Sequence, residues 1–208
     1  MYQSTRYNPH ALARAWGSLY RDRLGDVSDA VQLRLYRAQI ARAVLQAADI
    51  VIQSDRLTGP VTFREKTDSK TLIAELGPDI VWLSLLADVP LHRPLMLSHE
   101  NFIGHWRWLR HVWTYYKEPG QKQLPQTAEI PPDIITSLQQ QKYHTAIAHL
   151  HLAFRALSAK PFGDTSDNTS PARHLGFLTA LQWFCPYIGA ELLYRYGRIE
   201  TSAKRSPD

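Results

Sequence analysis

The segment His105–Lys117 holds the residues whose types and spacing point most directly to chemistry. It contains three of the six tryptophans of the sequence, together with three permanently charged cations. On a helix that advances about 100° per residue, its apolar and cationic side chains lie on opposite faces. The apolar face then consists of Phe102, Trp106, Leu109, Trp113 and Tyr116, and the cationic face of Arg107, Arg110, His111, Thr114 and Lys117. Because arginine and lysine side chains bind phosphate groups, this pattern predicts an anion-binding outer face.

Two rings of the same segment, those of Trp108 and Tyr115, fall on the boundary between the two faces. A partly exposed ring beside a cation can stack on an unpaired base, which stabilises a complex by about 1–3 kcal/mol per base. Further cations lie upstream, because residues 1–70 account for +4 of the net charge of +5. The sequence therefore predicts a nucleic-acid interface that consists of Arg34, Arg37, Arg107, Trp108, Arg110, Tyr115 and Lys117.

The same residue types permit less specific interpretations. Trp, Tyr and Arg are enriched at the centres of protein–protein interfaces, so the aromatic surface could instead dock a protein partner or a second copy of the chain. Tryptophans seven residues apart, such as Trp106 and Trp113, are also typical of a helical core. Glu100 and Glu118 lie on the cationic face and reduce its net charge. The first hypothesis is thus a nucleic-acid-binding subunit of a nucleoprotein complex, and the alternative is a protein-interaction or scaffold module.

The nine histidines do not form a recognisable metal-binding motif. His99, His105 and His111 are six residues apart, which turns each about 240° from the previous one on a helix. His144 and His151 share a face, but they are separated by about 10.5 Å along the axis, which is too far for one metal ion. The sequence contains neither a His-Glu-x-x-His motif nor a glycine-rich phosphate-binding loop, so we expect no metal ion and no cofactor.

A third hypothesis, an enzyme, depends on Arg93 and His99. Their separation falls within the loose Arg and His spacing used by some small helical ribonucleases. Pro94 lies between them and the pair spans the expected start of a helix, so a shared catalytic face is in doubt. The sequence has no nucleophile motif elsewhere. A small helical ribonuclease is therefore a further alternative, behind the two non-enzymatic functions.

The segments that must position these residues are mostly helical. Typical helix starts occur at Asn8-Pro9, Ser98, Pro131-Pro132 and Ser170-Pro171. Together with apolar periodicity they predict about six helices, over residues 9–24, 29–53, 70–87, 98–117, 131–159 and 172–197, with interruptions near Gly77-Pro78 and at Pro186. A small β-hairpin near residues 50–66 competes with a loop, because Ile50–Ile52 and Val61–Phe63 are β-prone.

Length and composition place these helices in one globular domain. The chain has 208 residues, 44% of them hydrophobic and 21% charged, with a net charge of +5 and a pI near 9.4. These values exclude a collagen-like or wholly disordered chain. They are sufficient for a single helical domain over residues 1–200, followed by a disordered tail at 201–208.

Three features indicate the compartment. The longest apolar stretch, Phe177–Tyr194, is interrupted by Gln182, Pro186 and Glu191, which favours a buried helix over a membrane span. Residues 1–9 are polar and contain no secretory signal, and the single cysteine, Cys185, excludes an intramolecular disulfide. We therefore expect a cytoplasmic protein without a membrane partner, whose main partner is DNA or RNA.

Overall fold

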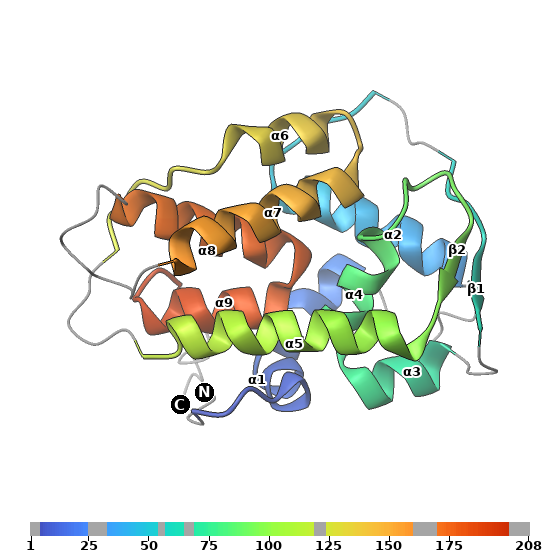
Figure 1. Ribbon diagram of the computed structural model, residues 1–208, viewed down its shortest axis with the longest axis horizontal. Coiled ribbons are helices and arrows are strands. Elements are labelled where there is room, and N and C mark those ends of the chain that lie inside the picture. The colour runs from blue at the N-terminus through green and yellow to red at the C-terminus, as the bar shows by residue number, and fades with distance from the viewer. Residues whose placement is uncertain are drawn as a thin grey trace, which may run out of the picture.

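The computed structural model describes residues 5–24, 33–53, 57–64, 69–118, 124–159 and 170–199. These residues form nine helices and two short strands (Figure 1). The helices are α1 (Pro9–Leu24), α2 (Leu33–Ala47), α3 (Ser69–Leu76), α4 (Pro78–Leu86), α5 (His99–Tyr116), α6 (Pro132–Gln139), α7 (Tyr143–Ser158), α8 (Pro171–Phe184) and α9 (Pro186–Arg195). The strands are β1 (Val61–Phe63) and β2 (Leu95–Leu97). The mostly α-helical class is therefore confirmed, whereas the expected tail at 201–208 lies outside the described residues.

Three of the expected helices are each divided into two. Gly77 adopts a φ of 82°, which places the break between α3 and α4 directly before Pro78, as the sequence predicts. Likewise α8 ends at Phe184 and Pro186 begins α9, with only Cys185 between the two helices. The third break, between α6 and α7, has no signal in the sequence. There Gln141 takes a φ of 55° in a run of glutamines without glycine or proline.

A short parallel sheet replaces the hairpin that we expected near residues 50–66. β1 pairs with β2, with Val61 opposite Leu95, and Ile50–Ile52 forms no strand. Parallel strands need a long connection, and here α3 and α4 supply it. Gly59 brings the chain to this partner, because its amide donates to the Leu91 carbonyl (2.8 Å) and a Cβ at this position would lie 2.3 Å from the carbonyl oxygen of Arg93. The hairpin prediction is thus wrong about the partner of β1.

Helix α4 forms the centre of the core. Its residues Asp79–Leu86 are all buried, and α1, α2, α5, α7, α8 and α9 pack around it. Figure 1 shows α4 inside the molecule, with α2 and α5 on different sides of it. A helix that is buried on every side must be apolar all round, which the run Ile80–Leu86 satisfies apart from one serine.

The apolar stretch Phe177–Tyr194 is divided between α8 and α9. In the described part of the chain, no helix is both long and apolar enough to cross a membrane. Glu191 in this stretch is buried but fully partnered, since it accepts hydrogen bonds from Trp16 Nε1 (2.8 Å) and Arg195 Nε (2.9 Å). Arg195 also donates to the Lys117 carbonyl at 2.8 Å. This network joins α9 to α1 and to the end of α5.

Candidate functional site

Helix α5 carries most of the residues that the sequence singles out. Its start is fixed by Asn101, whose side chain accepts the Ser98 amide (3.0 Å) and donates to Asp88 Oδ2 (2.7 Å). The predicted division into two faces is confirmed. The buried residues are Phe102, His105, Leu109, Val112, Trp113 and Tyr116, and the exposed face includes Arg107, Arg110, His111 and Thr114. The helix therefore anchors itself through its rings and presents cations to solvent.

Arg107 and Arg110 form the open part of the cationic face. They lie three residues apart, so their side chains leave the helix from neighbouring positions. Neither forms an ion pair with a residue that the structure describes, and the Arg110 guanidinium lies over the ring of Trp106, 5.4 Å from the ring centroid. Lys117 differs, because it is half-buried and its Nζ lies 3.7 Å from Glu118 Oε1. Two of the three predicted cations on α5 are thus available to an anion.

The two boundary rings face α7 rather than solvent. Trp108 stacks on His151 with ring centroids 4.1 Å apart and an interplanar angle of 12°. The Tyr115 hydroxyl donates to the Leu157 carbonyl at 2.7 Å. Both rings are half-buried, and their contacts hold α5 and α7 side by side. One face of Trp108 is therefore already covered, which limits the stacking surface that the sequence suggests.

Arg37 is not on the surface, so its interpretation as a phosphate ligand is wrong. Arg37 belongs to α2, and its side chain is fully buried. The guanidinium donates at 2.7–3.3 Å to the carbonyl oxygens of five residues: Leu85, Val89, Pro90, Leu91 and Arg93. Desolvation lowers the pKa of this guanidinium to about 10. Arg37 thus orders the turn that leads into β2. A signal exists in the sequence, because Arg37, Ile40, Ala41 and Val44 follow the spacing of one buried helix face.

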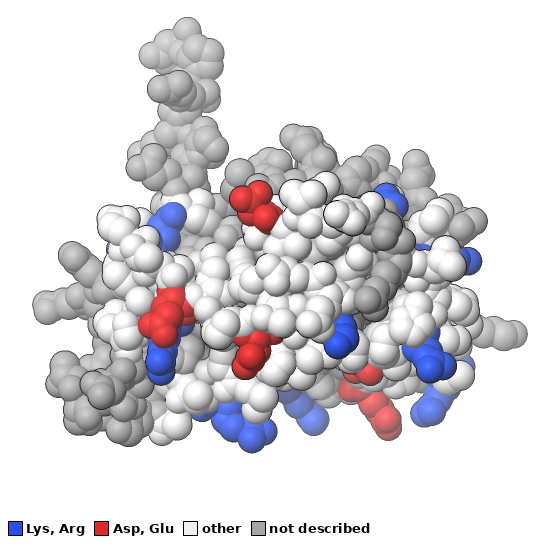
Figure 2. All heavy atoms as spheres, turned by 90° about the horizontal axis from the view of Figure 1, so that it is seen from above, with Lys and Arg blue, Asp and Glu red and all other residues white. Residues whose placement is uncertain are grey.

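Arg34 is exposed, but it lies on α2, on a different side of α4 from α5 (Figure 1). The predicted set therefore does not form one continuous surface. Figure 2, which views the molecule from above Figure 1, shows Lys and Arg side chains separated by uncharged residues and by Asp and Glu. Among the described residues on this face there is no broad positive area. On α5, Arg107 and Arg110 form an exposed pair of cations.

Arg93 and His99 lie at opposite ends of β2. Both are exposed, Arg93 in the turn before the strand and His99 as the first residue of α5. A strand rises about 3.3 Å per residue, so the three residues of β2 alone separate them by about 10 Å. The extended chain between them gives no support to a shared catalytic face.

His105 of α5 and His151 of α7 lie in the interface between these helices. His105 is buried and His151 is partly buried against Trp108. Desolvation lowers the pKa of each imidazole to about 4, and for His151 the neighbouring His105 adds to the effect. Within the described ranges, no three His, Cys, Asp or Glu side chains come together as a metal site.

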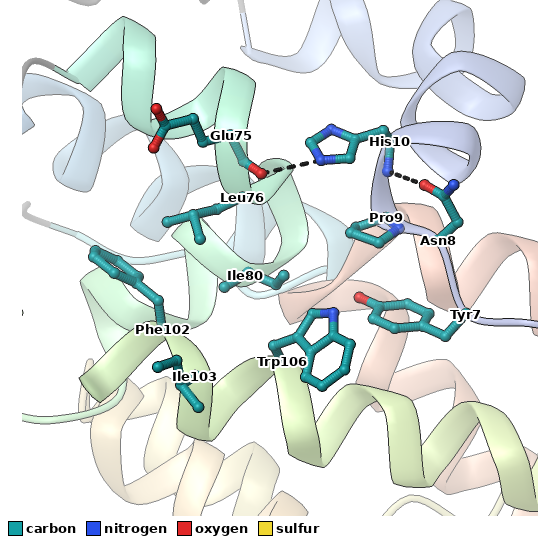
Figure 3. A pocket seen from close by; sticks show the side chains of 10 residues that line it. All are labelled: Tyr7, Asn8, Pro9, His10, Glu75, Leu76, Ile80, Phe102, Ile103 and Trp106. Atoms are coloured by element: carbon teal, nitrogen blue, oxygen red, sulfur yellow. Dashed lines mark hydrogen bonds between the residues drawn. The ribbon is translucent and has the colours of Figure 1, made fainter. Parts of the chain in front are cut away.

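A pocket opens beside α5, on the side away from α7. It has a volume of about 420 Å³ and is lined by Tyr7, Asn8, Pro9, His10, Glu75, Leu76, Ile80, Phe102, Ile103 and Trp106 (Figure 3). These residues come from the start of α1, the junction of α3 and α4, and the first two turns of α5. Sequence reasoning missed this pocket, since it named Asn8, Pro9, Phe102 and Trp106 for other reasons and the three segments meet only in the fold.

Three sets of contacts make the pocket rigid. Asn8 Oδ1 caps α1 by accepting the amides of His10 and Ala11, both at 3.1 Å. His10 Nε2 donates to the Glu75 carbonyl at 3.0 Å, which joins α1 to α3. Trp113 Nε1 donates to the Thr5 carbonyl at 3.0 Å and so holds the segment before α1 against α5. The Asn8-Pro9 helix start, which the sequence predicts correctly, is thus one wall of a preformed cavity.

Comparisons with known proteins assign no function to the exposed face of α5 or to the pocket beside it. No protein-family model matches the sequence, and no curated protein shows significant similarity to it. The geometry of α5 and of the adjacent pocket must therefore support any functional conclusion.

Proposed function

We propose that this protein binds nucleic acid without catalysing a reaction, through the exposed face of α5. The observation that carries the proposal is the pair Arg107 and Arg110. These two exposed guanidinium groups lie one helical turn apart and lack a carboxylate partner among the described residues. An arginine without an internal counter-ion keeps all its donors for an external anion, and its planar fork matches a phosphate group.

Helix α7 contacts α5 beside this face. Its Phe154 ring lies 5.0 Å from the ring of His111, and the next residue, Arg155, is exposed. Across α5 and α7 the sequence contains a single carboxylate, Glu100, two helical turns before Arg107. The two helices therefore present three arginines to solvent with little local repulsion of phosphate.

The protein-interaction alternative has less support. It depends on the rings of Trp108 and Tyr115, and both rings contact α7. A partner that used them as anchors would have to displace contacts within the fold. We therefore assign these rings a positioning role, in which they hold α5 so that its arginines face outward.

The proposal is tested by fluorescence anisotropy with labelled single-stranded and duplex oligonucleotides at 50 and 200 mM salt. Wild-type protein should bind at low salt and weaken as salt rises. The double variant Arg107→Ala, Arg110→Ala should bind more weakly, and its slope of log affinity against log salt should be smaller by about 1.4 for a single strand, since each phosphate contact contributes about 0.7.

A matched control removes two other exposed arginines. The variant Arg34→Ala, Arg64→Ala has the same net charge as the α5 variant, but its substitutions lie on α2 and after β1. We expect this control to bind with an affinity close to that of wild type. Absence of binding by the wild type at low salt would refute the proposal, and an equal loss in both double variants would show that only net charge matters.

A further inference from the structure

We propose that the pocket beside α5 binds a small apolar molecule that carries one carboxylate, the size of a fused two-ring aromatic acid. This inference does not rest on the nucleic-acid proposal, although Arg110 takes part in both. The volume of about 420 Å³ lies within the range of small-molecule sites in proteins, which are mostly apolar with a few placed polar groups. The walls meet this description, because Leu76, Ile80, Phe102 and Ile103 are apolar and the rings of Tyr7 and Trp106 are aromatic.

The pocket is preformed rather than induced. The hydrogen bonds of Asn8, His10 and Trp113 fix its N-terminal wall, as described above. Gly77 allows the close approach of the other wall, since a Cβ at that position would lie 2.9 Å from Pro9 Cβ. A rigid site loses little conformational entropy when a ligand binds, which favours binding of a small molecule.

One polar group that lines the pocket, the indole N–H of Trp106, and one cation beside the pocket, Arg110, are suited to a carboxylate. Figure 3 shows the indole nitrogen of Trp106 on the side of the ring that faces Tyr7 and Pro9, and this N–H forms no hydrogen bond with a described residue. The guanidinium of Arg110 lies over the same ring without a carboxylate partner among the described side chains. Figure 3 also shows the carboxylate of Glu75 directed away from Leu76 and Ile80, so it does not occupy the apolar part of the pocket.

The test uses 2-naphthoate, with 2-naphthamide as its uncharged counterpart of the same shape. Binding is measured by isothermal titration calorimetry and by the indole N–H resonances in a ¹H–¹⁵N spectrum, in which Trp106 is assigned through its loss in Trp106→Phe. We expect naphthoate to shift the Trp106 resonance more than those of the other indoles. We also expect it to bind about tenfold more tightly than the amide, because hydrogen bonds to a charged acceptor are the stronger ones.

Three variants and one control locate the site. Ile103→Trp should abolish binding of both compounds, because Ile103 is 46% exposed and a larger ring can fill the pocket without entering the core. Arg110→Ala should weaken naphthoate several-fold and leave naphthamide unchanged. Trp106→Phe should weaken naphthoate about tenfold. The control Trp108→Phe changes the same residue type on the side of α5 that faces α7, and it should bind as wild type does.

Each other result overturns the inference. If naphthoate produces neither heat nor a resonance shift at millimolar concentration, the pocket is not such a site. If binding persists in Ile103→Trp, whose folding is checked by circular dichroism, the ligand occupies another place. If the amide binds as tightly as the acid, the carboxylate assignment is wrong. None of these results depends on oligonucleotide binding, so failure here and failure of the nucleic-acid proposal are separate outcomes.

Discussion

The carboxylate of Asp79 in α4 accepts the backbone amide of Ile188 in α9 at 2.8 Å, although 109 residues separate the two in sequence. The other carboxylate oxygen accepts the Tyr187 amide at 3.2 Å. Asp79 thus caps the first turn of a helix to which it does not belong, where the helix dipole favours a negative charge. The Asp79 side chain is only 2% exposed, so its charged form is poorly solvated. This burial raises the pKa of the carboxyl from 3.8 to about 7, although the two amide hydrogen bonds act in the opposite direction.

The raised pKa of Asp79 predicts how stability depends on pH. Because the folded state binds the proton more tightly than the unfolded state, the contribution of this group to stability is largest below pH 4 and declines as pH rises through about 7. Asp79→Asn removes the titration and keeps one acceptor oxygen. We expect the free energy of unfolding of wild type, relative to this variant, to fall by about 2–3 kcal/mol between pH 5 and pH 8. Urea titrations at both pH values measure it, with exposed Asp133→Asn as the control, and a constant difference would contradict the expectation.

The lowered pKa of His151 predicts that its contribution to stability changes with pH in the direction opposite to that of Asp79. Its pKa is lowered to about 4 in the folded protein, so its stabilising contribution is present above about pH 6.5 and is lost as pH falls towards 4. His151→Phe keeps a ring stacked on Trp108 and cannot be protonated. The free energy of unfolding of this variant, relative to wild type, should rise by about 1–2 kcal/mol when the pH is lowered from 7.5 to 4.5. The expected rise is smaller than that of a fully buried group, because the ring is partly exposed.

The control for this prediction is His99→Phe, at the exposed first residue of α5. It should follow the pH dependence of wild type, because no buried imidazole is removed. A parallel shift of both variants would mean that the acid sensitivity does not arise at the contact of α5 with α7. Thermal unfolding at several pH values gives the same comparison independently of denaturant.

Sequence patterns were sufficient for the elements whose boundaries depend on local chemistry. The N-cap and proline at Asn8-Pro9, the glycine and proline at Gly77-Pro78, and Pro186 each act on their own backbone, so each break lies where these residues stand. The amphipathic division of α5 is also local, since it follows from the helical period alone. The helical period was therefore enough to place Arg107 and Arg110 correctly on the exposed face.

The remaining features depend on distant partners. β1 pairs with a strand more than thirty residues away, and no pattern within Val61–Phe63 identifies that partner. Arg37 has the charge of a surface residue, and it is buried because five carbonyl groups of another segment surround its guanidinium. The pocket likewise requires three segments to meet. Residue type alone does not specify such contacts, because they form only when the tertiary structure does.

Replacing Arg37 by lysine should destabilise the protein although it keeps the charge. A lysine ammonium has three donors at one point and cannot reproduce the planar set that serves five carbonyl oxygens. It would also leave a buried charge with fewer partners, so we expect a loss of about 3 kcal/mol or more in the free energy of unfolding. Hydrogen exchange should show faster exchange at Leu95, whose amide donates to the Pro60 carbonyl across the sheet.

The exposed residue Arg34 provides the matched control on the same helix. Arg34→Lys should change stability by less than about 0.5 kcal/mol, as is usual for surface substitutions. If Arg37→Lys were equally mild, the hydrogen bonds that order the turn before β2 would contribute little. In that case the buried position of Arg37 would need another explanation.

Two helical glycines should respond to alanine substitution in opposite directions. Gly176 in α8 lies against the loop before α6, where a Cβ would be 2.0 Å from the Glu129 carbonyl oxygen, whereas a Cβ at Gly104 in α5 would meet no atom within 4 Å. Gly104→Ala should therefore raise the free energy of unfolding by about 0.5–1 kcal/mol, because alanine restricts the unfolded chain and favours helix. Gly176→Ala should lower it by about 1–3 kcal/mol, because rigid backbone has to move. Urea titrations at one pH compare the two variants, and a stabilised Gly176→Ala would show that α8 does not approach the Glu129 backbone this closely.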